Sequence, residues 1–300
     1  MNNTVTDYKS SFDELGYAVI ESALPIEAFD KVKTILENIV NVAIQKFLSA
    51  EQKNDIKNLS DLDSKLVFLN SINPRIITFI QRTISRSPEF FNLSGSPIIS
   101  QWMRTFLSLE ENSPLYLLSN GIIFTIPRET IKRSTSFDIG WHKDIFFTIP
   151  ESRFLHVWIP LLHDATKEIG TLKVCPGSHK AGVGKQIYDP TATFNYTFMM
   201  DPEEVKKYNP VSVEVKRGDA LIFDARLIHA SGENTSEHIR CTMLGIYHDI
   251  SSEAFYPVQT TYKYHHKTPE QYFYELYGDE KIKPFVNDQL AEAGEPKGGV

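Results

Sequence analysis

The sequence predicts an α+β fold in which a helical section precedes an antiparallel barrel or jelly-roll core. Apolar residues recur at helical spacings of three and four in several stretches of residues 1–110. From residue 111 onward they gather instead in short segments rich in β-branched and aromatic residues, bounded by turn residues. Helical stretches do not alternate with these short segments, as they would in a parallel βαβ sheet, so the pattern favours an antiparallel core.

Amphipathic helical spacing is clearest over residues 25–48, and the same spacing returns at 74–84 and 98–107. Polar and charged residues fill the stretch 49–65, so we expect an exposed or mobile connection there. Near the N-terminus, residues 11–20 predict the end of a short helix that runs into a strand. These elements together form the helical section that precedes the barrel.

Strands are predicted where short apolar runs stand between turn residues. The runs are 115–127, 140–149, 153–162, 170–178, 211–224 and 239–250. Between two of them, residues 182–208 show no clear period but hold several aromatic side chains. A connection of this length is usually functional or mobile, and two interpretations stay open for it: a lid over a substrate, or a small helix packed on the barrel wall.

We expect one domain over residues 1–300, made of a mainly helical flank (1–110), a jelly-roll core (111–250) and a C-terminal extension (251–300). The last ten residues are small, polar and rich in glycine, so we expect them to be disordered.

The composition excludes several classes of protein. The chain has 41% hydrophobic and 23% charged residues, ordinary globular values that argue against disorder, collagen or a coiled coil. Its net charge of −7 argues against nucleic acid or an anionic membrane as the main partner, because those need basic surfaces. Cys175 and Cys241 are too few for a disulfide framework or a thiolate zinc site. Without a visible signal peptide or an apolar run that could span a membrane, we expect a cytoplasmic protein.

A histidine and an aspartate two residues apart, His142 and Asp144, lie in an apolar, strand-like segment. Residues i and i+2 of a strand project from the same face, so the two side chains would point together while Lys143 points away. One imidazole and one carboxylate supply two ligands of a 2-His-1-carboxylate site, which holds Fe(II) and leaves positions open. The third ligand has to come from a distant strand end, and His229 closes the apolar run LIFDARLIH.

An arginine, Arg240, follows His229 by eleven residues and opens another strand-like run. A buried arginine is rare unless it is paired, and its planar guanidinium suits bidentate binding of a carboxylate. The residue therefore predicts a carboxylate site deeper in the barrel than the metal. 2-Oxoglutarate has this requirement, because its keto-acid end chelates the metal while its far carboxylate needs a cation.

These residues stand in a wider pattern that resembles the phytanoyl-CoA hydroxylase-like family of Fe(II)/2-oxoglutarate dioxygenases. The segments IGTLKVCPGSHK (169–180) and GDALIFDARLIHASGENTSEHIR (218–240) match the family's Pro-Gly-Ser-His segment and its run from the distal histidine to the arginine. The resemblance covers most of the chain. It implies a double-stranded β-helix, a jelly roll of the cupin kind, with N-terminal helices packed on one sheet.

Position by position, the resemblance implies that His142, Asp144 and His229 are the iron ligands. It implies that Arg240 binds the distal carboxylate of 2-oxoglutarate, and that Fe(II), 2-oxoglutarate and O₂ are the cofactor and cosubstrates.

Two more residues match positions that line the cosubstrate pocket in the family. Ser231, two residues after the distal histidine, would donate a hydrogen bond to the same carboxylate, and Trp158 would line the pocket wall. From the residues alone, Ser231 is equally well explained by turn chemistry and Trp158 by the core. We expect His179 to order the turn in which it lies, and we assign no role to His156 or His163.

The resemblance implies hydroxylation of a small molecule at an unactivated C–H bond, with release of succinate and CO₂. The same chemistry can end in desaturation, cyclisation or epimerisation, and the sequence does not separate these. Two other classes are a non-catalytic jelly-roll binding module and a cupin-type isomerase or epimerase without 2-oxoglutarate. The presence of all three candidate ligands and of Arg240 argues against both.

The substrate and the oligomeric state are not determined by the sequence. Arg128, Lys132 and Arg133 lie in the loop before His142 and could hold an anionic group of the substrate. A solvated basic loop explains these residues as well.

Overall fold

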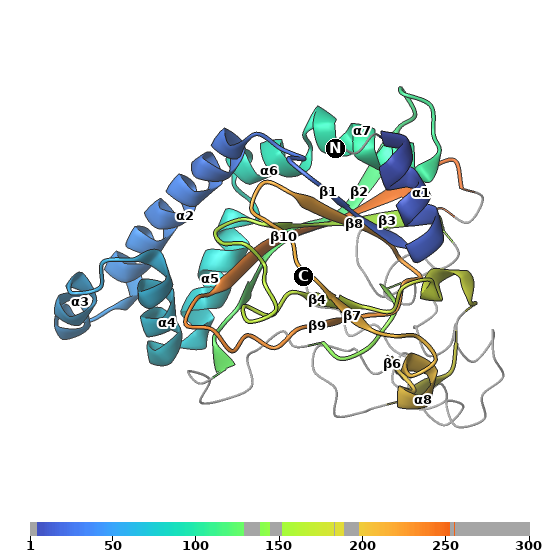
Figure 1. Cartoon of the computed structure of the whole chain (residues 1–300). Coiled ribbons are helices and arrows are strands. Elements are labelled where there is room, and N and C mark those ends of the chain that lie inside the picture. The colour runs from blue at the N-terminus through green and yellow to red at the C-terminus, as the bar shows by residue number, and fades with distance from the viewer. Residues whose placement is uncertain are drawn as a thin grey trace, which may run out of the picture.

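The computed structural model describes residues 5–128, 139–144, 152–182, 184–188, 198–252 and 255 of the chain. Helices lie on one face of a large antiparallel sheet, and a smaller sheet lies against its other face (Figure 1). Within the described residues these helices are α1 (Val5–Leu15), α2 (Ile26–Phe47), α3 (Ala50–Lys57), α4 (Leu62–Ile72), α5 (Pro74–Ile84), α6 (Pro88–Ser94) and α7 (Pro97–Leu107). A further helix, α8 (Pro202–Val205), lies on the side of the smaller sheet (Figure 1), and Ser178–Lys180 form a 3₁₀ turn.

Within the described residues the larger sheet has the strand order β1-β8-β3-β10-β2, the smaller sheet has the order β7-β4-β9, and a hairpin pairs β5 with β6. Neighbouring strands are antiparallel throughout. The strands are β1 (Tyr17–Ile20), β2 (Leu115–Thr125), β3 (Phe154–Pro160), β4 (Leu172–Val174), β5 (Gln186–Tyr188), β6 (Phe198–Met200), β7 (Val211–Val213), β8 (Ala220–Asp224), β9 (His229–Ser231) and β10 (Arg240–Asp249). The predicted α+β jelly roll is confirmed.

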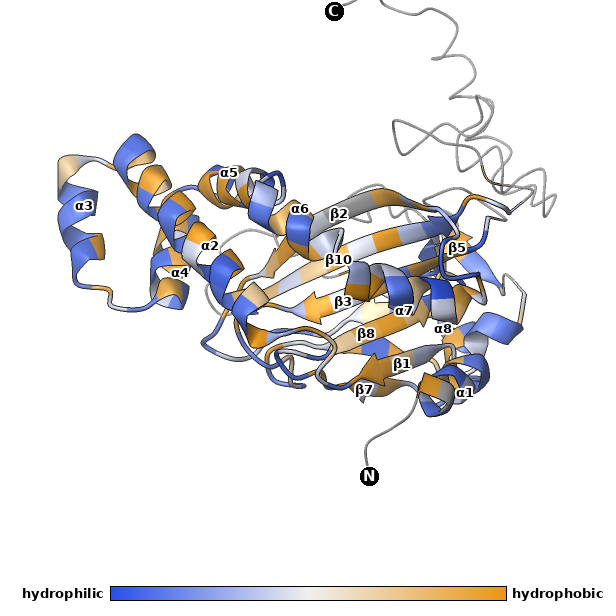
Figure 2. Ribbon diagram, turned by 90° about the horizontal axis from the view of Figure 1, so that it is seen from above, coloured by the Kyte–Doolittle hydropathy of each residue, from blue (hydrophilic) through white to orange (hydrophobic). Residues whose placement is uncertain are grey.

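The larger sheet is covered on both faces, which explains why its central strand β3 is buried at every position. Leu155, Val157 and Ile159 point toward the helices and belong to the main apolar core. Trp158 instead joins a second apolar cluster between the two sheets. Because side chains alternate along a strand, His156 faces that same space, which we call the barrel interior. Seen from above, α6 and α7 lie over the sheet on the face opposite to this interior (Figure 2).

The smaller sheet is extended by the segment that carries the predicted metal ligands. His142 N donates to His229 O at 2.9 Å, and His229 N donates back to His142 O at 3.0 Å. Ser231 N donates to Ile139 O at 2.9 Å. The segment 139–142 therefore lies antiparallel beside β9, on the side of β9 opposite to β4.

Three long helices were predicted correctly: 25–48, 74–84 and 98–107 correspond to α2, α5 and α7. The expectation of a connection at 49–65 was wrong, because the stretch contains α3 and the start of α4. Ser49 and Gln52 form a reciprocal capping box that starts α3. The helix buries only Ile56, so its exposure was predicted correctly.

Two strand predictions need correction. The run LIFDARLIH is not one strand, because β8 ends at Asp224, a turn closes with Leu227 N donating to Asp224 O at 2.9 Å, and β9 begins in the other sheet. The predicted strand at 140–149 is reduced, in its described part, to an isolated bridge at His142.

The division of the chain into flank, core and extension stays a prediction, and residues 256–300, which include the tail expected to be disordered, lie outside the described residues. Among the described helices, none combines the length and the apolar character that crossing a membrane requires.

Candidate functional site

The three predicted metal ligands converge at the smaller sheet. Ligand atoms of His142, Asp144 and His229 all lie within 4.8 Å of one another, and all three residues are buried. The Nε2 atoms of His142 and His229 each lie 3.4 Å from a carboxylate oxygen of Asp144. We call this group the facial cluster. The main-chain pairing of His142 with His229 brings the two imidazoles together, although the residues are far apart in sequence.

Both histidines of the facial cluster are oriented by main-chain carbonyl groups. Nδ1 of His142 lies 2.7 Å from Gly140 O, and Nδ1 of His229 lies 3.0 Å from Leu227 O. A carbonyl oxygen can only accept, so each Nδ1 carries the proton and each Nε2 presents a lone pair. Both lone pairs face the Asp144 carboxylate. Metal-binding histidines are commonly oriented in this way, by a hydrogen bond from the other ring nitrogen.

The electrostatics of the facial cluster suit a cation. Burial raises the pKa of Asp144, but the neighbouring histidines more than offset it and hold the pKa well below its usual value. Burial, followed by the nearby His229, lowers the pKa of His142. The carboxylate is therefore ionised and the His142 imidazole neutral near pH 7, the protonation states that metal ligands need.

A further histidine, His156 on β3, lies beside the facial cluster. Its side chain is fully buried, its ring stacks on Phe223 with the centroids 4.7 Å apart, and its Nε2 lies 3.0 Å from Asp144 Oδ2. That contact lies outside hydrogen-bond geometry, and neither ring nitrogen has a hydrogen-bond partner among the described residues. We assigned His156 no role from the sequence. Its position two residues before Trp158, on the same face of one strand, was the signal that could have placed it here.

Lys143 points away from the facial cluster, as predicted, but not into solvent. Its side chain is fully buried, and Nζ donates to the carbonyl oxygens of Ser178, Ala181 and Gly182 at 3.3, 3.2 and 2.6 Å. Burial lowers its pKa to about 8. The lysine thus fastens the segment after β4 against the segment that carries His142 and Asp144.

Arg240 lies in the barrel interior with its guanidinium buried. NH2 donates to Thr125 Oγ1 at 2.6 Å, and NH1 donates to Gly170 O. The guanidinium carbon lies 5.8 Å from the ring centroid of Trp158, a cation–π contact. The structure therefore brings together Arg240 and Trp158, two of the three residues predicted to contact the cosubstrate.

Ser231 lies on β9, two residues beyond His229, and pairs with Leu172 of β4. The next residue, Gly232, packs so tightly that a Cβ atom there would lie 2.2 Å from Thr171 O. The structure therefore places Ser231 on the strand of a predicted ligand, and its role toward the cosubstrate stays a prediction.

The other sequence predictions fall outside the facial cluster. Arg128 forms an ion pair with Glu233, whereas Lys132 and Arg133 lie outside the described residues. His179 packs against Gly16, and a Cβ atom added at Gly16 would lie 2.4 Å from Nδ1 of His179. This position agrees with a role in ordering its turn.

The connection 182–208 is partly regular, since it contains the β5–β6 hairpin and α8. Met200 and Val205 pack there with Cys175 and Ile228, and Met200 N donates to Trp141 O at 2.8 Å. The described part therefore matches the interpretation as an element packed on the barrel wall. Residues 189–197, on which the lid hypothesis mainly rests, lie outside the described residues.

The facial cluster fits the metal that the fold implies. Two imidazole nitrogens and one carboxylate are the donors of 2-His-1-carboxylate sites, which hold non-haem Fe(II) and leave adjacent positions open. The donor atoms are already convergent, and the second carboxylate oxygen is contacted by His156.

Comparison with known proteins finds relatives of this chain. The family model for phytanoyl-CoA dioxygenase (PhyH) matches residues 12–242, a range that contains all six predicted site residues. A phytanoyl-CoA dioxygenase domain-containing protein 1 homolog of Dictyostelium discoideum is 34% identical over 34% of this chain and 39% of its own length. The L-proline trans-4-hydroxylase of Streptomyces griseoviridis is 27% identical over 40% of this chain and 48% of its own length. These alignments span less than half of each relative.

A solved structure extends the likeness in fold to most of the chain. The non-haem α-ketoglutarate-dependent carbocyclase SnoK from nogalamycin biosynthesis superposes with a TM-score of 0.55 at 18% identity, covering 83% of this chain and 87% of that one. Because the family model matches well over half of the sequence, the chain belongs to the phytanoyl-CoA dioxygenase family.

Proposed function

We propose that this chain is an Fe(II)- and 2-oxoglutarate-dependent dioxygenase that hydroxylates a small molecule at an unactivated C–H bond, with release of succinate and CO₂. The observation that carries the proposal is the convergence of His142, Asp144 and His229 at a barrel whose interior also holds the buried Arg240. Family membership supports the same chemistry, and one relative is named as a proline hydroxylase.

One strand supports the proposed cosubstrate position. His156 contacts Asp144, and Trp158, two residues further along the same face of β3, contacts Arg240. Two residues of a strand advance by about 6.6–6.8 Å. A five-carbon dicarboxylate can span such an interval, with its keto-acid end at the facial cluster and its distal carboxylate at Arg240.

Each residue has a defined part in this proposal. When bound, Fe(II) supplies the oxygen-activating chemistry. His142, Asp144 and His229 would hold the metal. Arg240 orients the cosubstrate through its far carboxylate, and the apolar lining that includes Trp158 keeps bulk water from the cosubstrate.

The proposed partner is a small-molecule substrate. That this substrate carries an anionic group stays a prediction. Arg128 forms an ion pair with Glu233, so it is less suited to binding an anionic group of the substrate. The cytoplasmic location likewise stays a prediction from the sequence.

The test is succinate release from 2-oxoglutarate in a panel of candidate small molecules, with Fe(II) loaded without oxygen and O₂ then admitted. We expect substrate-stimulated succinate formation in the wild-type chain and none in the His142→Ala/His229→Ala variant. A His238→Gln variant, in which the substituted side chain is more than half exposed and lies outside the facial cluster, serves as control. Release of succinate that the double variant retains would contradict the ligand assignment.

The same experiment separates the alternatives. A non-catalytic binding module forms no succinate with any substrate, and a metal-dependent isomerase turns over substrate without 2-oxoglutarate. Mass spectrometry of the product distinguishes hydroxylation, which adds one oxygen atom, from desaturation, cyclisation or epimerisation, which do not.

A further inference from the structure

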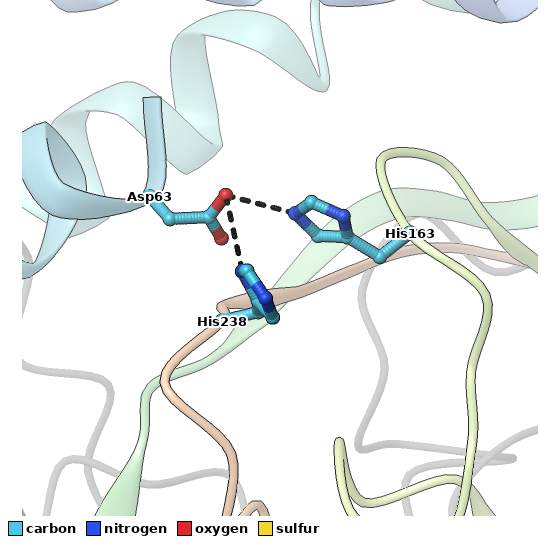
Figure 3. Close-up of side chains that lie close together, drawn as sticks. All are labelled: Asp63, His163 and His238. Atoms are coloured by element: carbon cyan, nitrogen blue, oxygen red, sulfur yellow. Dashed lines mark hydrogen bonds and ion pairs between the residues drawn. The ribbon is translucent and has the colours of Figure 1, made fainter. Parts of the chain in front are cut away.

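A second group of two histidines and one aspartate lies where the helical section meets the barrel. Asp63 belongs to α4, His163 follows β3, and His238 precedes β10. Figure 3 shows both imidazoles directed toward the carboxylate. Ligand atoms of the three residues lie within 4.8 Å of one another, which, among the described parts of the chain, is true of only one other group, the facial cluster. We call this second group the junction cluster.

The carboxylate of the junction cluster is preorganised. Its Oδ1 accepts the backbone N–H of Ile239 at 2.6 Å, and only about a tenth of the Asp63 side chain is exposed. This bond leaves Oδ2 for the histidines, with His163 Nε2 at 2.8 Å and His238 Nδ1 at 3.9 Å. Burial raises the pKa of Asp63, but the bonds from His163 and Ile239 more than offset it, so the pKa is lowered and the carboxylate is ionised.

The loop that presents His238 is held in place before any ligand binds. Asn234 Nδ2 donates to Thr125 O at 3.0 Å and to His238 O at 2.7 Å. Ser236 N donates to Asn234 Oδ1 at 3.1 Å, and His238 N donates to Ser236 Oγ at 3.1 Å. Because the loop is already ordered, binding a metal through His238 costs little conformational entropy.

The segment that carries His163 is equally fixed. Leu161 N donates to Cys241 O, and Ala165 N donates to Val215 O, both at 2.8 Å. The rings of His163 and His238 lie side by side, with their centroids 4.7 Å apart. The three ligands thus come from three separate segments, each anchored by hydrogen bonds.

We propose that the junction cluster is a second divalent-metal site, distinct from the facial cluster, with Zn(II) or a similar imidazole-binding metal as its ligand. Ligand atoms about 2.0–2.1 Å from a tetrahedral zinc lie about 3.3 Å apart. The observed separations of 2.8 and 3.9 Å fall on either side of this value, so changes of about half an ångström in each separation admit the ion. Water completes the coordination, because about a third of the His163 side chain and more than half of the His238 side chain are exposed.

The charge around the site favours a cation as well. Asp61, which caps the start of α4, lies close enough to His238 for the two to interact electrostatically. Without a metal, the contact between His163 and Asp63 is a simple ion pair that joins α4 to the barrel. The experiment is designed to separate these two explanations.

The test uses the full chain, stripped of metal by a chelator and titrated with Zn(II) by calorimetry and with Co(II) by visible absorption. The background is His142→Ala/His229→Ala, in which the facial cluster is removed, so the outcome does not depend on the proposed reaction. We expect one equivalent of metal in this background. Adding His163→Gln and His238→Gln should abolish it, whereas the control His179→Gln, a histidine that belongs to neither cluster, should leave it intact.

The wild-type chain should accordingly bind two equivalents, and His163→Gln/His238→Gln alone should bind one. Circular dichroism verifies that each variant is folded, which we expect because both substituted histidines are partly exposed. Two results would overturn the proposal: no Zn(II) or Co(II) bound in the His142→Ala/His229→Ala background, or an equivalent that survives loss of His163 and His238.

Discussion

At the scale of single residues, Arg240 is the side chain on which the proposed cosubstrate site depends most directly. Its guanidinium is buried and is held by Thr125, by Gly170 O and by the ring of Trp158. We expect Arg240→Ala to weaken 2-oxoglutarate binding by about 2–5 kcal/mol, because the distal carboxylate then lacks its charged partner. This corresponds to roughly a 30- to 4,000-fold higher Kd.

The measurement is 2-oxoglutarate binding to the metal-loaded protein, with Fe(II) affinity followed in parallel. Arg217→Ala is the matched control, because Arg217 also forms ion-pair and carbonyl contacts, to Asp30 and Leu161 O, but outside the barrel interior. An unchanged 2-oxoglutarate affinity in Arg240→Ala would move the carboxylate anchor to another residue.

His156 is the second residue with a testable part. Its Nε2 lies 3.0 Å from Asp144 Oδ2, the carboxylate oxygen next to His229 Nε2. Loss of a residue that orients a metal ligand typically weakens metal binding by about 10–100-fold. We therefore expect this loss in His156→Phe, measured by Co(II) titration in the His163→Gln/His238→Gln background, in which only the facial cluster binds metal. Thermal stability should be retained because the aromatic ring still stacks on Phe223. Equal Co(II) affinity in the variant and the wild type would show that His156 only fills space.

At the scale of elements, the close approach of β9 to β4 positions the residues between the distal histidine and the arginine. Gly232 follows β9, and a Cβ atom there would lie 2.2 Å from Thr171 O and 2.9 Å from the carbonyl carbon of Gly170. The same Gly170 carbonyl oxygen accepts from Arg240. Any side chain at position 232 must therefore displace backbone that the proposed cosubstrate site uses.

We expect Gly232→Ala to lower the free energy of unfolding by about 1–3 kcal/mol, the usual cost of overpacking. The 2-oxoglutarate affinity should fall as well, because Gly170 and Arg240 move with the strand. Denaturant unfolding and cosubstrate binding check the two effects. Gly182→Ala is the matched control, since a Cβ there meets no atom within 4 Å. A Gly232→Ala variant as stable as this control would mean that the strands can separate without cost.

At the scale of the whole molecule, the buried histidine His248 links stability to pH. It lies at the end of β10, stacks on Phe154, and its Nδ1 lies 2.8 Å from Ser152 Oγ. Burial, followed by the nearby His156, lowers its pKa from 6.5 to about 3. In the unfolded chain the imidazole binds a proton near pH 6.5, whereas in the folded chain it stays neutral until about pH 3. Its contribution to stability is therefore complete above pH 6.5 and is lost as the pH falls toward 3.

We expect the free energy of unfolding to fall by about 1.4 kcal/mol per pH unit in this range from the one proton that His248 excludes. His248→Phe should remove that part of the slope, because the ring is retained without a titrating group. Ser152→Ala, which removes the hydroxyl partner and keeps the imidazole, is the control and should keep the slope. Urea unfolding between pH 6 and pH 4 is the measurement, and parallel slopes for His248→Phe and the wild type would contradict this account.

Much of the fold followed from local pattern in the sequence. The spacing of apolar residues located α2, α5 and α7, and β-branched runs bounded by turns located β2, β3 and β10, because both signals depend on neighbours along the chain. The capping box of α3 was also present in the sequence, at Ser49 and Gln52, but the lack of apolar residues concealed it. The candidate ligands and Arg240 were located by spacing and by resemblance to a family.

Only the tertiary structure decided which residues share a space. His156 and His163 looked alike in sequence, each near one end of β3, yet one faces Asp144 inside the barrel and the other faces Asp63 outside it. The reason is physical: a strand buried on both faces shows no polar alternation, so the sequence of β3 cannot say which face is which. Likewise, His229 lies beside His142 because the turn after Asp224 sends β9 into the other sheet. That change of sheet depends on long-range pairing, which no local pattern encodes.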